Sequence, residues 1–180
     1  MDQKKAVKII KKLKEMYPDA TCSLDFTTPF QMLVAVCLSA QCTDERVNKT
    51  TPAIFAKYPT VYDFNNMDIK VLEELIHPCG FYTSKMIVEK FNGEVPDNME
   101  DLTSIPGVGR KSANVIMLEA FHNPQGIAVD THAKRISNRL GFSDESDPLK
   151  IEQDLLKVIP KEYYYDVNHL LVWHGRNTCM

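Results

Sequence analysis

A pair of glycines separated by one residue is the feature that most restricts how this chain can fold. Gly107 and Gly109 are two of only seven glycines in 180 residues, and they lie between two stretches with helical patterning. Glycine lets a backbone turn sharply and lets another group approach it closely, because it has no side-chain carbon. Pro106 precedes the pair and suits the end of the first helix. The segment predicts two short helices joined by a tight hairpin, over residues 101–119.

The rest of the sequence favours an all-α protein. Glycine is scarce, and the alternating apolar runs that indicate strands are few. Residues 30–40 are almost entirely apolar, which is typical of a helix buried on all sides, and Thr28 with Pro29 suits its start. No apolar run approaches the ~18 residues of a membrane span. We therefore expect an all-α fold and a cytoplasmic protein that does not contact a membrane.

The charge is distributed unevenly along the chain. The whole chain has a formal charge of −3, from 21 Lys and Arg against 24 Asp and Glu. Residues 1–14 contain six lysines and one acid, so they net +5 and the remaining residues net −8. Apolar residues at helical spacing in this stretch predict a lysine-faced amphipathic helix that ends near Pro18. This charge balance excludes a nucleic-acid-binding protein that is basic over its whole surface, but it does not exclude a local contact with phosphate.

The amino terminus of the second hairpin helix is a candidate anion site. Its first backbone N–H groups have no partner within the helix, and the helix dipole places partial positive charge there. A phosphate fits such a site without any formal charge on the protein. Gly107, Val108, Gly109 and Arg110 are the candidate DNA-binding residues of this hairpin, and the side chain of Val108 can insert into the core. The pattern matches helix–hairpin–helix DNA-binding proteins, which grip the backbone without reading sequence. An ordinary tight turn is the alternative.

Two ionisable residues stand at predicted helix starts. Lys111 falls in the first turn of the second hairpin helix, where the dipole and Arg110 disfavour another positive charge and partial burial would add to the effect. A neutral lysine can attack a sugar C1′ and form a Schiff base; a phosphate contact and a solvated charge are the alternatives. Asp130 follows three apolar residues, so we expect it to be partly buried. It could stabilise positive charge on a sugar ring, cap the next helix, or do both.

Six segments in a fixed order identify the chain with a known family. They are Gln-Cys-Thr-Asp at 41–44, Gly-Phe-Tyr-Thr-Ser-Lys at 80–85, Asn-Gly-Glu-Val-Pro at 92–96, the hairpin through Lys111, Val-Asp-Thr-His at 129–132 and His-Gly-Arg-Asn-Thr-Cys at 174–179. With these segments the chain closely resembles the endonuclease III family of DNA base-excision glycosylases. The resemblance implies two all-α lobes with DNA bound between them. It divides the chain into an N-terminal helix (1–20) that joins the terminal lobe, a six-helix barrel lobe (21–132) and a C-terminal lobe (133–180).

The resemblance also implies roles for single residues. Lys111 matches the Schiff-base lysine and Asp130 the catalytic aspartate of a bifunctional enzyme, which removes oxidised pyrimidines and then cleaves the strand by β-elimination. Gln41 matches the residue that wedges into the duplex, and Phe81 would fill the base stack from a loop tip after a turn at 78–80. Arg176 would contact phosphate near the cleft. The implied partner is double-stranded DNA with damaged bases or abasic sites, bound by a monomer.

The sequence departs from the family in two places. The family holds a [4Fe–4S] cluster with four cysteines; Cys179 matches the first of them, and Met180 is the last residue of the chain. One thiolate cannot hold a cluster, so either the sequence is truncated here or the protein dispenses with the cluster. We expect a truncation, and a cluster in an intact family member. After Lys85 the chain is shorter than the family by most of one helix, which leaves less than two turns over 86–91 and suggests missing residues.

The residues leave two other functions open. The chain could be a helix–hairpin–helix module that binds DNA without catalysis. It could also be a monofunctional glycosylase, which releases a base but does not nick the strand.

Overall fold

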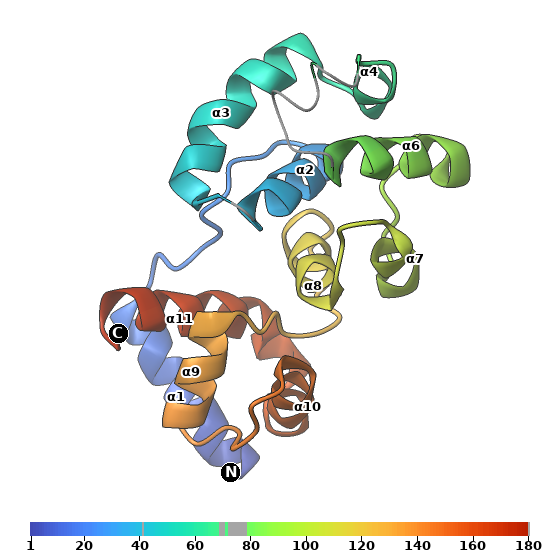
Figure 1. Cartoon of the computed structure of the whole chain (residues 1–180). Coiled ribbons are helices and arrows are strands. Elements are labelled where there is room, and N and C mark those ends of the chain that lie inside the picture. Colours follow the sequence, from blue (N-terminus) through green and yellow to red (C-terminus); the bar gives the residue numbers. More distant parts are fainter. Residues whose placement is uncertain (41, 69–70, 72–78, 180) are drawn as a thin grey trace. The chain divides into compact units, whose positions relative to one another are not determined.

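The computed structural model describes residues 1–40, 42–68, 71 and 79–179, with the backbone alone for 79–83. Within these ranges every regular element is a helix, which confirms the predicted all-α class. The chain forms two compact units (Figure 1): unit 1 combines Met1–Cys22 with Pro124–Met180, and unit 2 is Ser23–Asn123. The division therefore falls before residue 124, whereas the boundary expected from the sequence follows residue 132. Gln41 lies outside the described residues.

Unit 2 is built around a buried central helix. The predicted apolar helix is α2, and its N-cap Thr28 accepts a hydrogen bond from Gln31 N at 3.2 Å, as Thr and Pro at a helix start lead one to expect. Helix α2 packs against α3 and α8, and α4 packs against α6. The described helices of this unit are α2 (Pro29–Ser39), α3 (Asp44–Lys57), α4 (Val61–Asn65), α6 (Cys79–Phe91), α7 (Met99–Ser104) and α8 (Arg110–Glu119).

Helix α6 corrects the expectation for the segment around Phe81. The predicted turn at 78–80 and loop tip at 81–82 are wrong, because the backbone is helical from Cys79 onward. The helix continues through the shortened segment to residue 91, so it has 13 residues rather than less than two turns. The first turn of a helix tolerates Gly80, and burial of Ser84 and Ile87, at 1% and 0% exposure, stabilises the turns that follow.

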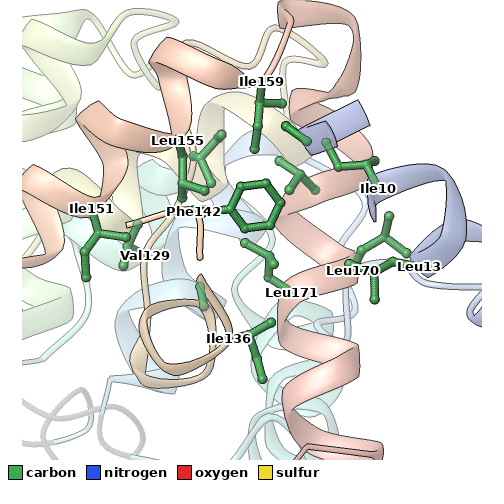
Figure 2. Close-up of a cluster of buried hydrophobic side chains, with 14 residues drawn as sticks. Ile10, Leu13, Val129, Ile136, Phe142, Ile151, Leu155, Ile159, Leu170 and Leu171 are labelled. Carbon is green, nitrogen blue, oxygen red and sulfur yellow. The ribbon is translucent and has the colours of Figure 1, made fainter. Parts of the chain in front are cut away.

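Unit 1 joins the two ends of the chain through one apolar core. Figure 2 shows Ile10 and Leu13 of the first helix beside Leu170 and Leu171 of the last, with Phe142 among them. The predicted amphipathic helix is confirmed and ends at Met16. Met16 itself is 46% exposed, so it does not belong to the buried face. The elements of unit 1 are α1 (Gln3–Met16), α9 (Thr131–Arg139), α10 (Pro148–Val158), the short 3₁₀ helix η1 (Lys161–Tyr163) and α11 (Tyr164–Asn177).

The lysine-rich face of α1 is exposed to solvent, and one of its lysines forms an ion pair with another helix. Lys14 Nζ lies 2.8 Å from both carboxylate oxygens of Asp166 on α11. Helices α1 and α11 pack together, so this pair spans their contact. In the part of the chain that is described, no helix has both the length and the apolar character to cross a membrane.

Candidate functional site

The hairpin between α7 and α8 has the geometry that its glycines predicted. Ile105 N donates to Leu102 O at 3.1 Å where α7 ends, and Val108 N donates to Ile105 O at 3.0 Å within the turn. Gly107 has a φ of +84°, in the left-handed region that side chains disfavour. Val108 is 4% exposed, so its predicted insertion into the core is confirmed. The buried side chains on both sides of Gly107 hold the turn in place.

Helix α8 begins without a side-chain cap. Its N-cap is Gly109, which offers no acceptor, whereas Thr43 accepts a hydrogen bond from a backbone amide of α3. The hydrogen bonds of the helix start with Ala113 N, which donates to Gly109 O at 2.9 Å. The backbone amides of residues 110–112 come before this first bond, so they have no acceptor within the helix. A Cβ built on Gly109 would meet no atom within 4 Å. The helix end therefore faces open space, as the binding of an anion such as a phosphate requires.

Lys111 lies in the first turn of α8, and its side chain is exposed together with that of Arg110. The opposite face of the helix holds it in place through Ala113, Ile116 and Met117, each at 0% exposure. Lys111 is not partly buried, because only the inward face of α8 packs into the core of unit 2. An exposed amine beside an uncapped helix end is accessible to a large substrate such as a nucleic acid.

Asp130 is the N-cap of α9 in unit 1. Its Oδ1 accepts a hydrogen bond from Ala133 N at 2.6 Å, and its carbonyl oxygen accepts one from Lys134 N at 2.9 Å. The side chain is partly buried, as predicted, because the three residues before it are buried. The carboxylate is thus held by the first turn of a helix, where the dipole favours negative charge.

A buried asparagine beside this segment is not among the residues predicted from the sequence. Asn168 on α11 is 7% exposed, and its Oδ1 accepts a hydrogen bond from Ala128 N at 2.7 Å. Its neighbours Val167 and Leu171, at 0% exposure, belong to the apolar face of the same helix. An amide within an apolar stripe at helical spacing is a sequence signal for a buried polar contact, but it does not identify the partner.

Comparison with known proteins identifies the family. A profile described as "HhH-GPD superfamily base excision DNA repair protein" matches residues 34–161. Endonuclease III of Synechocystis sp. (strain ATCC 27184 / PCC 6803 / Kazusa) is 48% identical, over 98% of this chain and 85% of the relative. The chain belongs to the endonuclease III family. Endonuclease III of Escherichia coli (strain K12) is 39% identical, over 100% of this chain and 89% of the relative.

Solved structures agree with this membership in the endonuclease III family. The structure of a trapped endonuclease III–DNA covalent intermediate has a TM-score of 0.94 and 39% identity to this chain, and the match covers 100% of the chain and 89% of that protein. A thermostable thymine-DNA glycosylase has a TM-score of 0.84 at 18% identity, which shows a shared fold. The chain is therefore an enzyme of base excision repair, in the DNA glycosylase/AP lyase class.

The other two residues that the resemblance singled out lie at the end of the chain. Arg176 is exposed on the last turn of α11. Cys179 is partly buried and in contact with two arginines of α9. Its Sγ accepts a hydrogen bond from Arg139 Nη1 at 2.9 Å, and its carbonyl oxygen accepts one from Arg135 Nη2 at 2.9 Å.

The residues present do not fit the [4Fe–4S] cluster that the endonuclease III family implies. Such a cluster takes four thiolate ligands. Among the residues that the structure describes, no three His, Cys, Asp or Glu side chains are grouped so that they could hold a metal ion. The sulfur of Cys179 contacts a guanidinium instead.

Proposed function

We propose that this chain is a bifunctional glycosylase/AP lyase that binds double-stranded DNA, removes oxidised pyrimidines and cleaves the strand through a Schiff base on Lys111. The observation that carries the proposal is the position of Lys111. Its exposed amine lies in the first turn of an uncapped helix that follows the Gly107 hairpin. A phosphate held at that helix end would bring the sugars of the same strand close to the amine.

The same hairpin provides for DNA binding by a chain of net charge −3. The backbone amides at the start of α8 attract phosphate without formal charge, and Arg110 adds one exposed cation beside them. Arg176 on unit 1 is a second exposed cation for a phosphate contact. Binding of this kind depends on the DNA backbone and not on base sequence, which suits an enzyme that must search for damage anywhere.

In the proposed reaction, the lone pair of Lys111 Nζ forms a bond to the sugar C1′ while the glycosidic bond breaks. The base leaves with the bonding electrons and takes up a proton. Loss of a proton from Nζ and cleavage of the C1′–O4′ bond, with a proton to O4′, then give the Schiff base. Removal of a proton from C2′ expels the phosphate on C3′ and cuts the strand. Water hydrolyses the Schiff base and returns the free amine.

Asp130 is the proposed carboxylate of this reaction. A negative charge stabilises the positive charge that develops on the sugar as the base departs, and a carboxylate can also take the proton that the attacking amine must lose. The capping bond from Ala133 N keeps one oxygen of the carboxylate in a fixed position. Such a group does not have to reorient during the reaction.

The covalent step has support from the family. One solved structure with 39% identity to this chain is a trapped covalent intermediate of endonuclease III with DNA. A non-covalent endonuclease III–DNA complex with the same identity has a TM-score of 0.91. Both complexes contain proteins that this chain matches over its whole length, which favours the same type of chemistry here.

Separate assays of base release and strand cleavage test the proposal. The substrate is a duplex with one thymine glycol, an oxidised pyrimidine, under single-turnover conditions. We expect the native chain to release the base and nick the strand, and Lys111→Ala to lose nicking and covalent trapping by borohydride. Base release without nicking would identify a monofunctional glycosylase. Binding of the duplex without either product would identify a DNA-binding module and refute the proposal.

The matched control is Lys161→Ala, which removes another exposed lysine and the same charge from η1 in unit 1. We expect this variant to keep both activities. An equal loss in Lys161→Ala and Lys111→Ala would show that net charge, and not the amine of Lys111, accounts for the effect.

A further inference from the structure

The segment that leads into Asp130 is buried but has no regular structure. Residues 126–129 belong to neither a helix nor a strand, and Ile127, Ala128 and Val129 are 0%, 8% and 7% exposed. Backbone N–H and C=O groups of a buried irregular segment cannot rely on water and need partners from elsewhere in the fold. The partner of this segment therefore determines the path by which the chain reaches Asp130.

Asn168 is that partner. Its Oδ1 accepts a hydrogen bond from Ala128 N at 2.7 Å, and its Nδ2 donates to Gly126 O in a longer contact of 3.4 Å. The same Nδ2 donates to Tyr164 O of its own helix at 2.7 Å. One amide N–H and two carbonyl oxygens fix which end of the Asn168 amide is the acceptor. The side chain is thus held by α11 and holds the segment on both sides of Ile127.

We propose that Asn168 is a positioning residue for the carboxylate of Asp130. Asp130 lies two residues after Ala128, and its own side chain is tied forward to Ala133 N of α9. The carboxylate is therefore fixed from two directions, by α9 ahead of it and by α11 through Asn168 behind it. The inference rests on the proposed function, because it gives Asn168 a role only if the carboxylate of Asp130 acts in base release.

The effect on the reaction follows from the loss of one of these two anchors. Asn168→Leu leaves Ala128 N buried without its acceptor, and the segment must move to find another or reach water. A displacement of a reacting group by ~1 Å can cost about 100-fold in rate. Asn168→Asp keeps an acceptor for Ala128 N, so we expect it to retain a much faster base release than Asn168→Leu. The comparison separates the bond to Ala128 from the general burial of the side chain.

The test measures single-turnover base release from the thymine glycol duplex, affinity for an undamaged duplex, and the melting temperature. We expect Asn168→Leu to slow base release by about 100-fold with unchanged affinity, and Asn168→Asp to stay within about threefold of the native rate. In an Asp130→Asn background, Asn168→Leu should slow base release no further, because the group that it positions is already absent. Ser143→Ala is the control, since it removes another buried side-chain hydrogen-bonding group of unit 1, with partners Asp154 and Glu145.

The outcomes distinguish this inference from the proposed function. If Asp130→Asn alone releases the base at the native rate, the proposed role of Asp130 fails and the inference fails with it. If Asp130→Asn is slow but Asn168→Leu is as fast as the native chain, only the inference is refuted. The same holds if Asn168→Leu slows base release equally in both backgrounds, or no more than Ser143→Ala does.

Discussion

Asp130 caps a helix and is also the proposed reacting carboxylate, and two substitutions separate these roles. Asp130→Ala removes the acceptor of the 2.6 Å bond from Ala133 N, which costs about 1 kcal/mol within a range of about 0.5–2. It also removes negative charge from the start of α9, which adds about 0.3–1 kcal/mol. Asp130→Asn keeps the acceptor and loses only the charge. At about 2–4 °C per kcal/mol for a chain of this size, Asp130→Ala should lower the melting temperature by about 2–12 °C and Asp130→Asn by about 1–4 °C.

Base release should follow a different order from stability. Loss of a general acid–base or charge-stabilising group lowers the rate by about 100-fold or more, and both variants lack the carboxylate. We therefore expect both to be slow in single-turnover base release, although Asp130→Asn is nearly as stable as the native chain. If Asp130→Asn keeps the native rate while Asp130→Ala loses it together with stability, Asp130 is a helix cap only and the reasoning is refuted.

Three further predictions follow from other contacts. A Cβ on Gly175 of α11 would lie 3.0 Å from Cβ of His132, so Gly175→Val should force α9 and α11 apart and cost about 1–3 kcal/mol; an unchanged melting temperature would contradict this packing. A hydrogen bond from Lys157 holds the pKa of Asp154 below its ordinary 3.8. The charged form of Asp154 therefore stabilises the fold above that pH, and the difference in melting temperature between native chain and Asp154→Asn should shrink as the pH falls below it. Prolonged exposure to a metal chelator should leave the melting temperature of the 180-residue chain unchanged, because arginines contact Cys179 and the described residues contain no group of side chains that could hold a metal ion. A drop of several degrees would show that a bound metal stabilises the chain.

Local sequence rules predicted the elements whose conformation depends on a few neighbouring residues. The start of α2 at Thr28 and Pro29, the turn at Gly107 and the burial of Val108 each follow from the chemistry of adjacent residues. The capping position of Asp130 belongs to the same class, because a cap depends on the three residues after it.

Features that depend on distant contacts could not be predicted in this way. Gly80 favours a turn locally, but helix α6 packs against α4 and extends through that position. Lys111 is exposed because only the opposite face of α8 packs, which a residue pattern around position 111 does not reveal. Asn168 and Ala128 are 40 residues apart in sequence, so no local pattern identifies their hydrogen bond.

The measurement that tests the central claim most directly is the identity of the residue that becomes bonded to DNA. The native chain is reduced with borohydride in the presence of a duplex with one abasic site, digested, and analysed by mass spectrometry. We predict a single sugar adduct on Lys111, and no adduct in Lys111→Ala under the same conditions. An adduct on another residue, or equal trapping in Lys111→Ala, would contradict the assignment of Lys111 as the nucleophile.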